Sequence, residues 1–294
     1  MSARKGAVPL PRKVPRWARS PGVHPVRWAK RAAHHLGYLA GAYLPARVGF
    51  RQLCNLEVVR DAPVPRGPNV LVVANHRSLV DSWLVLDNVF GGLRDLAHFH
   101  RGPIHPAAYE NFLDTPFKKF LFGEVLKCVP VLRGGADADV MGTLDALAAM
   151  LRTGTMIIFP EGSRTRTGYV SPTSRWGVGR VILHARPTVI PVFHHGSQHV
   201  LPVGGKRITF GHDLFVRVGA PLAVEDLLLL PDERSTWQAI SDRALQAIAS
   251  MERDFLRDRG EPLPVWFDHG ILSLGASSPP RPFQAPQDER GDLL

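Results

Sequence analysis

The sequence predicts an α/β fold with a mixed central sheet flanked by helices. Short apolar runs of strand length alternate with longer stretches of helical periodicity, which is the pattern of a largely buried sheet covered by helices. Of the 294 residues, 45% are hydrophobic and 21% are charged, as in ordinary globular proteins. These values exclude a wholly disordered, collagen-like or coiled-coil chain.

Apolar runs of four to eight residues are predicted to form the strands of this sheet. Each run is too short for a buried helix and is rich in the β-branched residues that strands favour. The predicted strands cover residues 69–74, 125–132, 155–160, 188–194 and 214–218.

Two longer segments are predicted to be helices. Residues 137–152 carry apolar side chains at helical spacing and are followed by Gly154, a common helix terminator. This helix lies between two predicted strands and makes a strand–helix–strand unit with them. Residues 225–259 are also helical in pattern.

Positive charge is concentrated at the N-terminus. The chain has 36 Lys and Arg residues against 26 Asp and Glu residues, a net charge of +10. Eleven of the basic residues lie between Met1 and Asn55, where there is no acidic residue, so the remainder has 25 basic and 26 acidic residues. A nucleic-acid-binding groove across the main domain is therefore not indicated. The basic segment is expected to seek an anionic surface.

The two ends of the chain differ in composition from its centre. Residues 1–24 are predicted to be a disordered basic leader, and residues 275–294 a disordered tail. Residues 25–55 combine a basic face with an apolar face, which is typical of a basic amphipathic N-terminal helix at a lipid interface. A helix packed on its own domain fits this periodicity equally well. The uncharged stretch 36–46 is about half of the roughly 20 residues that a membrane span requires.

The first candidate site follows the predicted strand 69–74. His76 and Asp81 can meet only if His76 lies in a turn and Asp81 in the first turn of a helix, and Ser78 supports this because Ser three residues before Asp is typical of a helix cap. A carboxylate bonded to one imidazole nitrogen leaves the other nitrogen free to take a proton from a hydroxyl. The alternative is structural: Ser78 and Asp81 cap a helix, and His76 is a loop residue with satisfied hydrogen bonds.

The second candidate site follows the predicted strand 155–160. Its turn combines a carboxylate, a glycine, a hydroxyl and a guanidinium, which together suit a phosphate group. An ordinary turn with an exposed arginine explains the same residues equally well. The residues are Glu161, Gly162, Ser163 and Arg164.

Short blocks occur in a characteristic order between residues 69 and 222. Asn75-His76-x-x-x-x-Asp81 is followed by Val-Pro-Val-x-Arg ending at Arg133, then by Phe-Pro-Glu-Gly-Ser-Arg and by Ile-Pro-Val. In these blocks the chain resembles the glycerolipid acyltransferase family, which includes the lysophosphatidate acyltransferases. The resemblance implies acyl transfer to the free hydroxyl of a lysophospholipid, with residues 56–274 as the acyltransferase domain.

The resemblance also implies roles for individual residues. His76 would be the general base and Asp81 its orienting partner. The residues expected to bind the substrate are Asn75, Ser78, Arg133, Glu161, Gly162, Ser163 and Arg164.

A narrower likeness to the tafazzins concerns the acyl donor. Residues 127–131, 175–180 and 195–202 look like segments of that transacylase branch. Tafazzins usually have Asp where Ser82 stands and Lys where Ser163 stands, so the donor stays open between acyl-CoA, an acyl carrier protein and a phospholipid.

The resemblance implies that the enzyme needs no bound cofactor and no metal. Its expected partners are anionic membrane lipids and a lysophospholipid acceptor, with no nucleic acid, and the sequence carries no signal of oligomeric state. The expected location is a membrane surface, either the cytoplasmic face of a bacterial membrane or a mitochondrial membrane.

Two other classes of protein fit the sequence less well. A non-catalytic membrane scaffold would leave His76, Asp81 and the Glu161 turn unexplained. A metal-dependent hydrolase would need ligands from one of two histidine groups, neither of which has a familiar catalytic spacing. These groups are His98, His100 and His105, and His194, His195 and His199.

Overall fold

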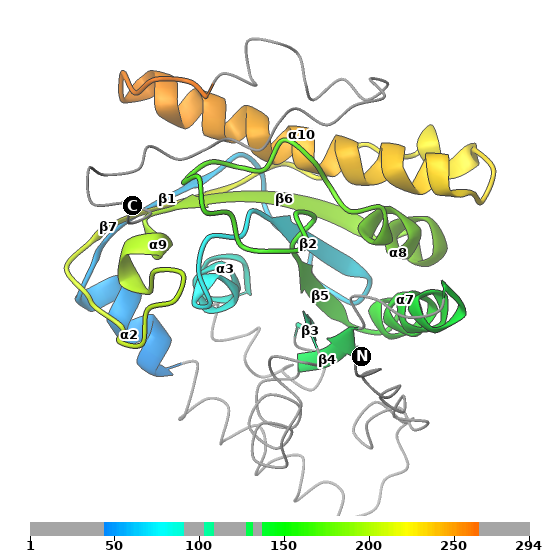
Figure 1. Ribbon diagram of the computed structural model, residues 1–294, viewed down its shortest axis with the longest axis horizontal. Helices are drawn as coiled ribbons and strands as arrows, with labels where there is room; N and C mark the ends of the chain where they lie inside the picture. The colour runs from blue at the N-terminus through cyan, green and yellow to red at the C-terminus, as the bar shows by residue number, and fades with distance from the viewer. Residues whose placement is uncertain (1–43, 91–102, 109–127, 132–136, 265–294) are drawn as a thin grey trace, which may run out of the picture.

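A five-stranded sheet forms the centre of the computed structural model, which describes residues 44–90, 103–108, 128–131 and 137–264 (Figure 1). All neighbouring strands of this sheet run parallel except β6 and β7, which are antiparallel. Their order across the sheet is β1 (Asn55–Arg60), β7 (Asp213–Val218), β6 (Thr188–His195), β2 (Val70–Ala74) and β5 (Thr155–Ile158).

A two-stranded parallel sheet extends this centre. It pairs β3 (His105–Ala108) with β4 (Cys128–Val131). An isolated parallel bridge between Ile104 and Met156 joins it to β5, with Ile104 N donating to Thr155 O at 2.9 Å. The two sheets are therefore continuous in hydrogen bonding.

Helices cover both faces of the sheet (Figure 1). One face carries α7 (Asp137–Leu151), α8 (Gly177–Ala185) and the long α10 (Arg234–Asp258), which is preceded by the 3₁₀ helix η5 (Leu227–Leu229). The other face carries α2 (Leu44–Gln52), α3 (Asp81–Phe90) and the short α9 (Ser197–Val200).

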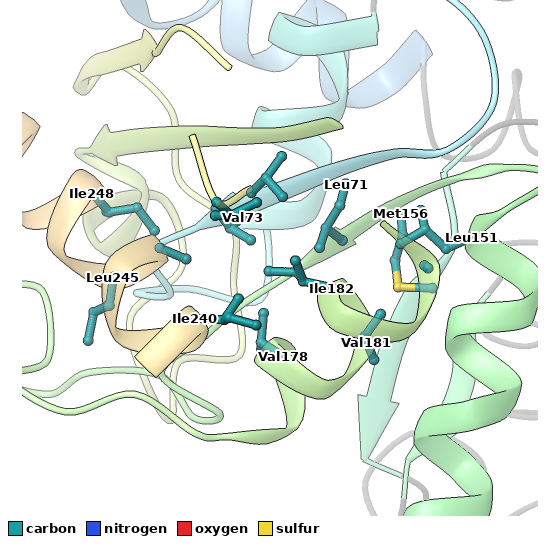
Figure 2. Packing of buried hydrophobic residues seen from close by; sticks show 14 of the residues in the cluster. Leu71, Val73, Leu151, Met156, Val178, Val181, Ile182, Ile240, Leu245 and Ile248 are labelled. Carbon is teal, nitrogen blue, oxygen red and sulfur yellow. The ribbon is translucent and has the colours of Figure 1, made fainter. Parts of the chain in front are cut away.

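Alternation along β2 divides the core between the two faces. Leu71 and Val73 point toward α8 and α10, as Figure 2 shows, whereas Val70, Val72 and Ala74 pack on the side of α3. Every residue of β2 is buried, as expected for a central strand between helices. The ends of this buried strand are consequently held in place by both helix layers.

The predicted fold class is confirmed, and each predicted strand is present with somewhat different bounds. The sequence did not predict β1 and β3. β1 lies at the sheet edge, where most of its side chains are at least partly exposed, and β3 is four residues long and contains Pro106. Neither strand has the apolar run that marks a buried strand.

The predicted helix 225–259 is too long at its N-terminal end. The structure begins α10 at Arg234 and places only η5 before it. Pro231 has no amide hydrogen and disfavours helical backbone at the preceding residue, and Leu230 is extended with ψ 160°. Pro231 therefore separates η5 from α10 and prevents one continuous helix over 225–259.

The predicted leader and tail lie outside the described residues, as do residues 25–43 of the predicted interfacial segment. Within the described ranges, α2 is the helical part of that segment. Across those same ranges, no helix is both long enough and apolar enough to cross a membrane.

α8 and α10 approach each other closely at Gly179. Its amide donates to Ser241 Oγ at 2.7 Å, and a Cβ atom there would lie 1.8 Å from the carbonyl oxygen of Trp237. In contrast, a Cβ atom at Gly142 of α7 would meet nothing within 4 Å. The two glycines form a matched pair for testing the packing.

We expect Gly179→Ala to lower the free energy of unfolding by at least about 2 kcal/mol, because the clash is with backbone and cannot be relieved by a side-chain rotation. Gly142→Ala should instead raise it by about 0.5–1 kcal/mol, since alanine favours the helix. Urea unfolding of both variants measures the difference. Equal effects would contradict the proposed α8–α10 contact.

Candidate active site

His76 and Asp81 meet at the C-terminal end of β2. β2 ends at Ala74 and α3 begins at Asp81, so His76 lies in the connecting turn, as the spacing predicts. Its Nδ1 atom lies 2.8 Å from Asp81 Oδ2. The same carboxylate oxygen accepts the backbone amides of Arg77 at 2.6 Å and Ser78 at 2.7 Å. Asp81 thus holds both the imidazole and the turn that carries it.

The Asp81 carboxylate is fully buried yet stays ionised at neutral pH. Burial alone would raise its pKa, but the nearby His194 and the hydrogen bond from His76 outweigh burial and lower the pKa to about 2. The two backbone amides act in the same direction, because they donate to the charged form. Asp81 can therefore orient and stabilise a positively charged imidazole.

The ring of His76 is held by stacking as well as by its hydrogen bond. It lies parallel to the ring of Phe159, with 4.1 Å between ring centroids and 10° between planes. Because an ionised carboxylate only accepts hydrogen bonds, Nδ1 carries the hydrogen and Nε2 has the free lone pair. The side chain is 17% exposed, so the imidazole is partly accessible.

The second candidate loop holds the backbone of His76. Glu161 Oε1 accepts the His76 amide at 2.7 Å, and Oε2 accepts the Ser171 amide at 3.0 Å. The His76 carbonyl in turn accepts the amide of Thr165 at 2.8 Å. The two loops that the sequence marked as candidate sites therefore form one site.

The rest of the second loop is more accessible. Ser163 is exposed and Arg164 is half-buried, and within the described residues the Arg164 side chain has no hydrogen-bond or ion-pair partner. Gly162 has φ +72°, and a Cβ atom there would lie 2.6 Å from Arg175 Cγ. A glycine is thus required at this turn. Arg133 lies outside the described residues.

Asn75 and Ser78 are fully buried and bind protein groups. The Asn75 amide exchanges hydrogen bonds of 2.9 Å with the backbone of His194, which extends the pairing of β2 with β6. Ser78 Oγ donates to the carbonyl of Leu201 at 2.7 Å. These contacts suit residues that position the turn better than residues that bind a substrate.

His194 completes the buried surroundings of Asp81. Its Nε2 atom donates to the carbonyl of Asn75 at 2.7 Å and lies 3.8 Å from Asp81 Oδ2. Burial lowers the pKa of His194, against the raising effect of the Asp81 carboxylate. Because a carbonyl oxygen only accepts hydrogen bonds, Nε2 of His194 carries a hydrogen. The sequence suggested His194 only as a metal ligand.

The two histidine groups considered for a metal-dependent hydrolase are only partly described. His98 and His100 lie outside the described residues. Among the residues that the structure does describe, no three His, Cys, Asp or Glu side chains are placed to hold a metal ion.

A buried ion pair that the sequence analysis missed supports the same turn. Arg77 Nη2 lies 2.5 Å from Glu252 Oε1 of α10, and both side chains are about 1% exposed. Arg77 also donates to the carbonyl of Gly168, and Glu252 accepts the amide of Val170 at 2.9 Å. The sequence offered one signal of this pair: Glu252 lies four residues after Ile248, so a charged residue falls on the apolar face of the predicted helix.

A cavity of about 580 Å³ lies near the C-terminal end of β6, on the side of the sheet that α10 covers. Phe255 of α10 and Arg259, the residue after this helix, line it, together with His195 and the first residues of β1 and β7. His76 stacks on Phe159, which packs on the side of α3. His76 is not among the residues that line this cavity.

One segment of the chain matches a known protein family. Residues 55–195 match the family model described as Acyltransferase. Over this segment the chain is similar to acyltransferases. This segment contains His76, Asp81 and the whole Glu161–Arg164 loop, so the family match covers both candidate loops.

A solved acyltransferase shares the fold. The crystal structure of the 1-acyl-sn-glycerophosphate (LPA) acyltransferase PlsC from Thermotoga maritima is 19% identical and superposes with a TM-score of 0.53. The match covers 78% of this chain and 84% of that chain. No curated protein sequence matches this chain. The predicted enzyme class, an acyltransferase, is thereby confirmed, whereas the tafazzin-like features stay a prediction.

Removing one partner of the buried Arg77–Glu252 pair should destabilise the folded protein. We expect Glu252→Gln to lower the free energy of unfolding by about 3 kcal/mol, because it leaves a buried guanidinium without its counter-charge. The control is Glu57→Gln, which breaks the exposed pair with Arg259 and should cost less than about 1 kcal/mol. Urea unfolding compares the two, and similar losses would contradict the buried pair.

Glu161 should make stability depend on pH. Burial raises its pKa from 4.5 to about 8, against the lowering effect of the two backbone amides. Between these values the folded chain keeps a proton that the unfolded chain releases, so stability falls as pH rises, by at most about 1.4 kcal/mol per pH unit. Glu161→Gln should remove this slope in unfolding experiments. If the difference in free energy of unfolding between parent and variant stays constant from about pH 5 to pH 8, the raised pKa of Glu161 is contradicted.

Proposed function

We propose that this acyltransferase transfers a fatty acyl chain to the free hydroxyl of a lysophospholipid, with His76 as general base and Asp81 as its orienting partner. The observation that carries the proposal is the 2.8 Å contact between His76 Nδ1 and the buried, ionised Asp81. This pair lies within the segment that matches the acyltransferase family.

In the proposed reaction, His76 Nε2 takes the proton of the acceptor hydroxyl as its oxygen attacks the acyl carbonyl carbon. The new C–O bond gives a tetrahedral intermediate, with no covalent bond to the enzyme. As the C–S or C–O bond to the donor breaks, the imidazolium returns the proton to the leaving thiolate or alkoxide. Asp81 stabilises the imidazolium between these steps, because its carboxylate remains charged.

The Glu161–Arg164 loop is proposed to hold the acceptor. Arg164 has no ion-pair partner among the described residues and can offer two parallel hydrogen bonds to a phosphate. The hydroxyl of exposed Ser163 lies beside it in the sequence, and Gly162 permits the tight turn. Glu161 contributes indirectly, since both its oxygens hold backbone amides. Arg133 remains a further candidate for phosphate contact.

Two observations support a glycerolipid as the substrate. The structure from Thermotoga maritima that shares this fold is described as a 1-acyl-sn-glycerophosphate acyltransferase. The order of the sequence blocks between residues 69 and 222 resembles the glycerolipid branch of the family. Since such substrates reside in bilayers, we also propose that the protein works at a membrane surface, with the basic residues of segment 25–55 facing anionic lipid.

A phospholipid is the second candidate for the acyl donor, besides acyl-CoA or an acyl carrier protein. The residues that resemble tafazzins favour it, among them Cys128-Val129-Pro130-Val131, which form β4. Trp176 of the same set packs on Trp237 with 5.5 Å between ring centroids, which indicates a structural role for that residue.

The proposed base can be tested in a lipid mass-spectrometry assay on vesicles that contain lysophosphatidate or monolysocardiolipin. His76→Ala should lower turnover by about 10²–10⁴-fold, which is the usual contribution of general-base catalysis, while the unfolding midpoint stays near that of the parent. The matched control is His184→Ala. His184 belongs to α8, and its Nε2 atom lies 2.9 Å from Asp232 Oδ2. Turnover by His184→Ala should be unchanged.

Running the assay with and without acyl-CoA separates the donors. Product that requires acyl-CoA indicates a biosynthetic acyltransferase, and product from intact phospholipid alone indicates a transacylase. Near-normal turnover by a folded His76→Ala variant would refute the proposed base.

A further inference from the structure

An exposed apolar surface lies beside residues 75–80, which connect β2 to α3 and are called the catalytic turn because they carry the proposed base His76. Of the ten large hydrophobic side chains that are exposed among the described residues, seven belong to α2 and the residue after it, to the catalytic turn and to the loop 202–211. A soluble chain rarely gathers such residues without a partner. We call the following residues the docking surface: Leu44, Val48, Leu53, Val203, Ile208 and Phe210.

Contacts between α2 and the loop 202–211 make this surface continuous. The ring of Phe210 lies against Gly49, where a Cβ atom would be 2.4 Å from the ring. The amide of Gly211 donates to the carbonyl of Leu53 at 2.7 Å. In Figure 1 the loop runs from α9 down to α2, at the end of the molecule opposite the start of α10.

The charge of the docking surface is positive. Residues 196–212 contain no acidic residue, and neither do residues 44–56. Arg47 and Arg51 of α2 both pair with Asp87 of α3, at 2.7 and 2.6 Å, so this one carboxylate offsets one of their two charges. Lys206 and Arg207, in contrast, are exposed and have no ion-pair partner within the described part of the chain. The surface therefore presents unpaired cations among apolar side chains.

The docking surface adjoins the catalytic turn. Ser78, two residues after His76, donates its hydroxyl to the carbonyl of Leu201 at 2.7 Å, immediately before the loop. Leu79, the next residue in the turn, is 42% exposed. A bilayer that meets the loop would consequently lie beside the turn that carries His76.

We propose that the loop 202–211 and the outer face of α2 form a docking surface for anionic phospholipid bilayers, which places the turn that carries His76 against the membrane. Apolar side chains interleaved with unpaired cations complement a layer of anionic headgroups above acyl chains. The role of this docking in catalysis rests on the proposed function, because docking brings His76 to its acceptor only if the acceptor is a lipid of the bilayer. The binding itself is measured without any turnover.

Two variants of the full chain test the apolar and the charged parts separately in vesicle co-sedimentation. With vesicles of phosphatidylglycerol and phosphatidylethanolamine, Val203→Ser/Ile208→Ser should weaken partitioning at least about tenfold at every salt concentration, since the loss is of apolar contact. Lys206→Gln/Arg207→Gln should weaken it about fivefold per charge at low salt, and this difference should shrink at high salt. Phe210 is left in place because it packs on α2.

The matched control is Leu229→Ser/Leu230→Ser. These leucines are 82% and 47% exposed and precede α10 in the chain. In Figure 1 the start of α10 lies at the end of the molecule opposite α2. Their replacement should leave vesicle binding unchanged. Thermal unfolding of each variant establishes that it is folded, and the charge variant keeps the test decisive if the apolar variant unfolds.

Turnover distinguishes failure of docking from failure of the proposed function. Folded loop variants should lose turnover on vesicle lipids in proportion to lost binding, yet keep parental turnover with a water-soluble, short-chain lysophospholipid. Absence of any acyl transfer by the parent would refute the proposed function while the co-sedimentation still decides docking. Parental vesicle binding by both loop variants would overturn the proposed docking surface.

Discussion

The hydrogen bond from the His76 amide to the Glu161 carboxyl group joins the two halves of the site. It can form because β2 and β5 are parallel neighbours, with Val73 beside Ile158, so their following loops leave the sheet at the same edge. Glu161 is buried against this amide and that of Ser171, and loss of either contact would leave an unsatisfied buried group. The catalytic turn and the proposed acceptor loop consequently hold one geometry together.

Polar contacts from the opposite face of the sheet reinforce this geometry. α10 contributes Glu252 to the buried Arg77, and also holds the residues that follow the acceptor loop, since Asp242 accepts the Ser174 hydroxyl at 2.6 Å. The same helix packs on α8 at Gly179. A helix near the C-terminal end of the described chain thus supports a site built from much earlier residues, through both its apolar core and its buried charges.

The family and the local chemistry contribute different parts of the functional conclusion. At 19% identity, the likeness to PlsC of Thermotoga maritima establishes the fold, and a fold alone does not determine a reaction. The family match supplies the acyltransferase class. The buried Asp81 beside a partly accessible His76 then supports a mechanism, and the exposed apolar and basic loop supports a place for that mechanism at a bilayer.

The sequence by itself determined the α/β class, the buried strands and the meeting of His76 with Asp81, because apolar periodicity and the five-residue spacing act locally. It did not reveal β1 and β3, which depend on pairing with distant strands, or the start of α10 after Pro231. Only the tertiary structure showed that Asn75 and Ser78 bind β6 and Leu201, and that Arg77 pairs with Glu252, 175 residues away. Partners so distant in the chain are chosen by packing, which no local pattern encodes.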